Sequence, residues 1–185
     1  MILYHGSPKT GLKELRFSEE MSRFGGEMGL KHGLGTYLTT SLDEAIAYAV
    51  GGSYYLVKVK GQVFDTTDRE EMMGFISEIE SEFKCEGLLS QNSLILEVIN
   101  QTMIGRISGI NFARAILNAI NDQESLYNDF TLKYFEGDLD KVDSYFSSRF
   151  NYQAIKLNNL GSATWVIILD PEGANLEIIE EISCE

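Results

Sequence analysis

The chain has 185 residues, of which 44% are hydrophobic and 11% aromatic, and its formal net charge is −13. This length predicts one domain, and the apolar content excludes disorder over most of the chain. The negative charge argues against direct nucleic-acid binding and favours a basic protein partner. Cys85 and Cys184 show no metal-ligand or disulfide-framework spacing, and no signal peptide or membrane span is visible, so we expect a cytoplasmic protein without a metal site.

Short strands and loops dominate the first third of the chain. The sequence predicts an apolar strand over residues 1–4, with His5 at its end, where the chain is expected to turn through Gly6-Ser7-Pro8. A second strand is predicted over residues 36–39, directly after the glycines at 33 and 35. Polar residues at such strand ends more often serve function than packing, which makes His5 a candidate site residue.

A capping box and a third strand follow. Ser41-Leu-Asp-Glu44 predicts a helix start in which the serine and glutamate side chains pair with free N–H groups, and Gly51-Gly52 ends that helix. The β-branched and aromatic run over residues 54–60 predicts a strand.

From residue 67 to about residue 150 the apolar residues take helical spacing. A second capping box, Thr67-Asp-Arg-Glu70, predicts a helix whose buried side carries Met72, Met73, Phe75, Ile76 and Ile79. Further helices are expected over residues 93–101, 110–121 and 139–150. Strands return over residues 153–157, 165–169 and 176–182, with a turn at 170–173. We therefore predict an α+β fold: one domain, 1–185, whose β core carries a helical insertion at about 67–150.

Two polar clusters are candidates for ligand binding. His5 can exchange hydrogen bonds with a ligand hydroxyl, Gly6 permits close backbone approach, and Ser7 adds a polar group. In the second cluster, Gly33 and Gly35 open the loop and Tyr37 presents a ring for stacking on a planar group. Each cluster alone also fits a structural role, His5 as a turn residue and Tyr37 as a core aromatic.

Taken together, the two clusters resemble the NAD-binding half of the ADP-ribosyltransferases of the diphtheria-toxin and poly(ADP-ribose) polymerase branch. The shared features are the His5-Gly6-Ser7 strand end, the Gly-x-Gly-x-Tyr motif whose tyrosine is Tyr37 at the start of a strand, and the small-residue helix with Ala and Tyr after it. The resemblance implies that His5 binds a ribose hydroxyl, that the Gly6 backbone binds the nicotinamide carboxamide, and that Tyr37 stacks on nicotinamide. Ser7, Gly35 and Thr36 complete the implied NAD site.

The last 35 residues resemble the closing hairpin of small bacterial and phage-borne members, including phage anti-CRISPR transferases. Those proteins carry a third catalytic residue, an acid, in or after the turn, where this chain has Asn159. Breaking the nicotinamide–ribose bond builds positive charge on the sugar, which a carboxylate stabilises better than an amide. Three interpretations are open: Asn159 weakens turnover but keeps binding, another acid such as Glu27 or one from the helical block completes the site, or the domain binds NAD-like ligands without reaction.

The resemblance implies a mono-ADP-ribosyltransferase that uses NAD to modify a protein, and a phage-encoded anti-defence effector is one form of it. The alternative is a catalytically weakened NAD- or ADP-ribose-binding protein that acts by blocking a partner. An RNA 2′-phosphotransferase is disfavoured, because the sequence shows no convincing set of arginines near the motifs. The helical block is unmatched by the resemblance and is a candidate for target recognition.

Overall fold

The structure is a computed structural model that describes residues 1–16, 35–105, 109–138, 154–158, 163–168 and 173–184; over 109–113 it describes the backbone only. Several predictions therefore lie outside the described residues: those on Glu27, Gly33 and Asn159, the helix over 139–150, and most of the turn over 170–173.

Seven strands form one sheet in the order β4-β5-β6-β2-β1-β3-β7. Neighbours are antiparallel, except that β4 and β5 run parallel. The strands are β1 (Ile2–Ser7), β2 (Thr36–Thr39), β3 (Ser53–Val59), β4 (Val63–Asp65), β5 (Ala154–Asn158), β6 (Thr164–Ile168) and β7 (Leu176–Ser183). The five strands that the sequence predicted after residue 35, which are β2, β3, β5, β6 and β7, are confirmed to within one residue at each end.

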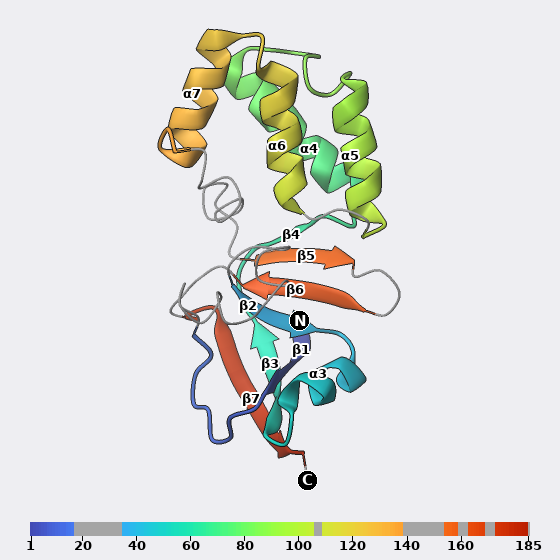
Figure 1. Ribbon diagram of the computed structural model, residues 1–185, viewed down its shortest axis with the longest axis vertical. Helices are drawn as coiled ribbons and strands as arrows, with labels where there is room; N and C mark the ends of the chain where they lie inside the picture. Colours follow the sequence, from blue (N-terminus) through green and yellow to red (C-terminus); the bar gives the residue numbers. More distant parts are fainter. Residues whose placement is uncertain (17–34, 106–108, 139–153, 159–162, 169–172, 185) are drawn as a thin grey trace.

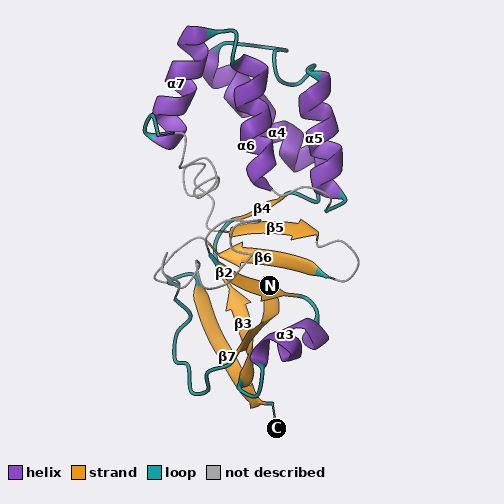
Figure 2. Ribbon diagram, viewed as in Figure 1, coloured by secondary structure: helices purple, strands orange, loops and turns teal. Residues whose placement is uncertain are grey.

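Five helices lie in the described part of the chain. They are α3 (Leu42–Ala49), α4 (Arg69–Phe83), α5 (Ser93–Met103), α6 (Gly109–Ile120) and α7 (Glu124–Phe135). Figure 1 shows that α4 to α7 gather at one end of the molecule, beyond β4 and β5, whereas α3 lies beside β1 and β3. The separation of strands and helices in Figure 2 agrees with the predicted α+β class. None of these helices has the length and apolar character of a membrane span.

The helix starts differ in detail from the predicted capping boxes. Ser41 caps α3 as predicted, accepting the Glu44 N–H at 3.3 Å, but the Ser41 N–H donates to the Thr39 hydroxyl. For α4 the prediction was wrong by one residue, because Asp68 is the N-cap and accepts the N–H groups of Glu70 and Glu71. A carboxylate at this position also interacts favourably with the helix dipole, which a threonine cannot do.

Strand β6 is buried on both faces. Trp165 and Ile167 belong to the hydrophobic core formed with α4 to α7, which we call the helical-side core. Val166 and Ile168 point the other way, into a second core with Leu3, Leu38, Tyr55 and Val57. Because side chains alternate along a strand, β6 joins the two cores within one five-residue segment.

The sheet opens between β1 and β2. Strand β1 pairs with β3 from Ile2 to Ser7, but its described ladder with β2 consists of the pair Tyr4 and Thr39. Strand β2 instead pairs with β6 along its whole length. The second half of β1 and the first half of β2 are therefore adjacent without a regular ladder, and the candidate site lies there.

Candidate functional site

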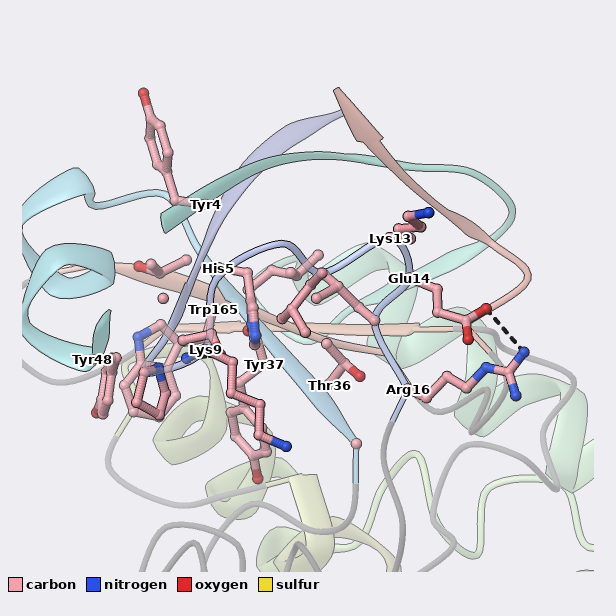
Figure 3. A pocket seen from close by; sticks show the side chains of 18 of the residues that line it. Tyr4, His5, Lys9, Lys13, Glu14, Arg16, Thr36, Tyr37, Tyr48 and Trp165 are labelled. Atoms are coloured by element: carbon pink, nitrogen blue, oxygen red, sulfur yellow. Dashed lines mark hydrogen bonds and ion pairs between the residues drawn. The ribbon is translucent and has the colours of Figure 1, made fainter. Parts of the chain in front are cut away.

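A pocket of about 700 Å³ lies where β1 and β2 diverge. Its walls come from β1, the segment after β1, β2, α3 and β6, and Figure 3 shows the side chains that line it. All six described residues that the sequence predicted as site residues line this pocket: His5, Gly6, Ser7, Gly35, Thr36 and Tyr37. The fold thus brings together two motifs that are about 30 positions apart in the chain.

His5 lies inside β1, opposite Tyr55 of β3, and not at the strand end where the sequence placed it. Its Nδ1 lies 2.9 Å from the carbonyl oxygen of Tyr37. Burial lowers the pKa of His5, and the bond to Tyr37 opposes this only in part, so the ring is neutral near pH 7. Since a carbonyl only accepts, Nδ1 carries the proton, and Nε2 is left as a hydrogen-bond acceptor.

Tyr37 contributes an aromatic wall. Its ring meets the ring of Trp165 edge to face, with centroids 6.0 Å apart and an interplanar angle of 83°. Burial raises the pKa of the Tyr37 phenol, so this group stays protonated at physiological pH. Tyr37 also packs against the helical-side core. The same residue is therefore both a core aromatic, as one of its two interpretations predicted, and part of the pocket wall.

Glu44 connects α3 to the floor of the pocket. Its carboxylate accepts the indole N–H of Trp165 at 2.7 Å and the hydroxyl of Thr39 at 2.8 Å. A charged acceptor strengthens both bonds. The Glu44 side chain therefore fixes the orientation of Trp165, against which Tyr37 rests.

The glycines of the two motifs serve close packing within the protein. A Cβ at Gly6 would lie 1.9 Å from the carbonyl oxygen of Ala45 in α3, and a Cβ at Gly35 would lie 2.5 Å from the carbonyl oxygen of Ile168 in β6. The sequence predicted a close backbone approach at Gly6 and an open loop at Gly35. The structure shows that neighbouring backbone fills the space beside both of them.

Ser7 and Thr36 are both buried at the pocket but differ in hydrogen bonding. The Ser7 hydroxyl oxygen accepts the N–H of Lys9 at 3.1 Å, which stabilises the turn after β1. Thr36 is 5% exposed, and its hydroxyl has no hydrogen-bond partner in the described part of the chain. An unpartnered buried hydroxyl is costly, so Thr36 is a group that a ligand can satisfy.

Residues 9–16, the segment that follows β1, add positive charge to the site that the sequence motifs did not indicate. Lys9, Lys13 and Arg16 all line the pocket, together with one acid, Glu14, which lies 2.9 Å from Arg16. Their spacing after His5 was visible in the sequence, but a cluster of charges in a loop is usually only a solvated surface.

The 9–16 segment is tied to the far edge of the sheet. Glu181 of β7 accepts the backbone N–H of Gly11 and the hydroxyl of Ser53, both at 2.7 Å. The Tyr55 hydroxyl lies 2.9 Å from the Lys9 carbonyl oxygen and accepts the N–H of Leu12 at 3.3 Å. The bonds from Gly11 and Ser53 lower the pKa of Glu181, which keeps it ionised. The segment is therefore a positioned wall of the pocket.

The catalytic acid is the part of the predicted site that the described residues do not supply. Asn159 and Glu27 lie outside them, and the one carboxylate among the described lining residues is Glu14. In this part of the chain no group of three or more His, Cys, Asp or Glu side chains is arranged to hold a metal ion.

No protein-family model matches the chain, and no curated protein matches it. The chain is similar to a solved structure described as the crystal structure of an anti-CRISPR protein. The similarity covers 97% of this chain and 95% of that one, with 14% sequence identity and a TM-score of 0.38. A likeness of this size assigns neither a fold family nor an activity.

Proposed function

We propose that the protein is a mono-ADP-ribosyltransferase that uses NAD to modify a protein target. The observation that carries the proposal is the contact between the two motifs: His5 Nδ1 is 2.9 Å from the Tyr37 carbonyl oxygen at the wall of a pocket of about 700 Å³. Both residues belong to the motifs that resemble the transferases, and the resemblance implies that His5 binds a ribose hydroxyl of NAD and that Tyr37 stacks on the nicotinamide.

The groups in the pocket fit the chemistry of a dinucleotide. His5 Nε2 offers an acceptor for a ribose hydroxyl, and the Tyr37 ring offers a surface for a planar base. The buried Thr36 hydroxyl lacks a partner that a polar ligand group would supply. Pockets of this type combine apolar and aromatic walls with a few placed polar groups.

NAD supplies an ADP-ribosyl group when a nucleophile replaces nicotinamide at the ribose carbon. The role of this chain's residues is to position the ligand: the neutral His5 holds a hydroxyl, and Tyr37, braced by Trp165, fixes the plane of the ring. The target's side chain forms the new bond to the ribose carbon and loses its proton, and nicotinamide departs with the electrons of the broken bond. The formal charge of −13 favours a basic target. A role against host defence stays a prediction from the resemblance.

Release of nicotinamide tests the proposal. The purified protein is incubated with NAD and with a bacterial lysate as a source of targets, and free nicotinamide and labelled protein are measured. We expect both products with the unaltered protein and neither with His5→Ala or Tyr37→Ala. Tyr54→Phe serves as the control, because Tyr54 of β3 is outside the pocket. Equal labelling by all variants would overturn the assignment of the site.

A second candidate function is binding without turnover. It is favoured by the charge of the described pocket lining, where the one carboxylate, Glu14, is exposed and paired with Arg16. On this proposal the protein binds NAD or ADP-ribose and releases no nicotinamide. Asn159→Asp separates the two candidates: a large gain in NAD cleavage indicates an enzyme that lacks its acid, and no gain in a variant that still binds NAD indicates a binding protein.

A further inference from the structure

The charge of the described pocket lining is opposite to the charge of the chain. The whole sequence has 28 acidic and 15 basic residues, but the charged side chains among the described lining residues are Lys9, Lys13, Arg16 and one acid, Glu14. Among the described residues, neither Lys9 nor Lys13 forms an ion pair. A positive wall of this kind in an acidic protein attracts an anion to one place on the surface.

Hydrogen bonds to β3 and β7 hold the backbone of the 9–16 segment in place. Gly11 is bonded to Glu181, and Lys9 and Leu12 are bonded to the Tyr55 hydroxyl, so three points between residues 9 and 12 are fixed to β3 and β7. Tyr55 is fully buried, which makes its position a rigid one. The lysine side chains extend from a fixed backbone, and this lowers the entropy cost of placing them around a ligand.

Thr36 gives a second and independent indication of a ligand. Thr36 lines the same pocket, its hydroxyl oxygen is buried, and no described group bonds to that oxygen. Lysine and arginine side chains pair with phosphoryl oxygens, and a hydroxyl can donate to one of them. An aromatic wall at Tyr37 and a cationic wall at residues 9–16 fit a ligand that has a planar base next to phosphates.

We propose that Lys9, Lys13 and Arg16 bind the diphosphate of a nucleotide, and that Glu14 competes with this diphosphate for Arg16. The inference rests on the proposed function in one respect, namely that the diphosphate is the one within NAD. Glu14 Oε2 lies 2.9 Å from Arg16 Nη2, and both side chains are exposed, so a phosphoryl group can displace the carboxylate at little cost. Glu14 thereby sets the affinity of the site.

Calorimetric titration with ADP and with adenosine tests the proposal, because the two probes differ by the diphosphate alone. We expect ADP to bind more tightly than adenosine, and added salt to reduce the difference. Lys9→Met and Lys13→Met should each weaken ADP binding about fivefold and leave adenosine unaffected. Glu14→Gln should strengthen ADP binding about threefold, since it removes the competitor of the ligand.

Lys58→Met is the matched control, because Lys58 is an exposed lysine of β3 outside the pocket. It should leave ADP binding unchanged. Three results would overturn the proposal: ADP binds no more tightly than adenosine, neither probe binds at millimolar concentration, or Lys58→Met weakens ADP binding as much as Lys13→Met does. Circular dichroism of each variant verifies that it is folded.

The two proposals fail in different ways. If ADP binds as expected and no nicotinamide is released from NAD, the diphosphate site stands and the transferase activity does not. If nicotinamide is released and the KM for NAD is the same in Lys13→Met and in Lys58→Met, the activity stands and the diphosphate site is wrong. An RNA oligonucleotide that competes with ADP at the same lysines would exclude a dinucleotide-specific site.

Discussion

The carboxylate of Glu80 accepts the backbone N–H of Leu89 at 2.6 Å, nine residues further along the chain. It also accepts the N–H of Ser90 at 2.7 Å, and Glu80 itself is 6% exposed. In the turn between α4 and α5, the buried carboxylate thus accepts backbone N–H groups, a role that carbonyl oxygens have inside a helix. Together with backbone hydrogen bonds such as the one from the Leu88 N–H to the Cys85 carbonyl oxygen, this side chain holds the loop 85–92 in place.

Glu80→Gln should lower the free energy of unfolding by about 1–3 kcal/mol at pH 7, because an amide is a weaker acceptor for two backbone donors. Burial alone would raise the pKa of Glu80, but the bonds from Ser90 and Leu89 outweigh it and lower the pKa below the usual 4.5. This contribution is present above pH 4.5 and is lost as the pH falls below it. Urea titrations of the variant and the unaltered protein should therefore converge in acid. Glu86→Gln, at an exposed position, is the control and should change little.

The lowered pKa of His5 makes a second pH prediction. The folded protein holds this imidazole neutral, whereas the unfolded chain binds a proton near pH 6.5, so protonation favours unfolding. Stability is complete above pH 6.5 and falls as the pH drops toward the folded-state pKa. His5→Gln, which keeps a donor for the Tyr37 carbonyl, should reduce this loss between pH 6.5 and 5. Identical pH profiles for the two proteins would show that His5 is not buried in its neutral form.

Two substitutions of Tyr37 distinguish the contribution of ring stacking to NAD binding from that of hydrogen bonding. Tyr37→Phe keeps the ring that meets Trp165 and should change NAD affinity less than about threefold, whereas Tyr37→Ala should weaken it more than about tenfold. Calorimetry gives both values. If Tyr37→Phe is as weak as Tyr37→Ala, the phenol hydroxyl and not the ring face contributes the binding.

Thr36 predicts opposite changes in stability and in binding. Thr36→Val removes a buried hydroxyl that has no described partner, so it should raise the free energy of unfolding by about 1 kcal/mol. The same change should weaken nucleotide binding about fivefold, because the ligand loses a hydrogen bond. Thermal unfolding and calorimetry on one preparation measure both. A variant with lower stability would mean that the hydroxyl is already satisfied in the free protein.

Local signals in the sequence predicted most of the elements. Strand β2 has the predicted bounds, and α3 begins with its predicted cap, Ser41. Helix α7 was missed because its N-cap, Gln123, makes no side-chain capping bond that would mark its start. Its apolar face, which includes Phe130 and Tyr134, is present in the sequence and was not recognised. Strand β4 was missed because three residues hold too little pattern, and its partner β5 lies some 90 positions later.

The candidate site was predicted in its residues but not in its surroundings. His5 and Tyr37 came from motif spacing, whereas the packing role of Gly6 depends on α3 crossing β1 at that residue. The cationic wall depends on Glu181, which holds Gly11 from 170 positions away. Contacts between such distant residues follow from the order of strands in the sheet, and local pattern contains no information about that order.

Because β6 is buried on both faces, its packing affects how the molecule unfolds. Its alternating side chains belong at once to the helical-side core and to the core around Tyr55, so loss of packing in either core exposes one face of β6. Partial unfolding of the helical end would strip one face of the strand that pairs with β2 along the pocket. Hydrogen exchange should therefore find the amides of β6 among the slowest, released together with those of α4 and β2 in a single cooperative unit.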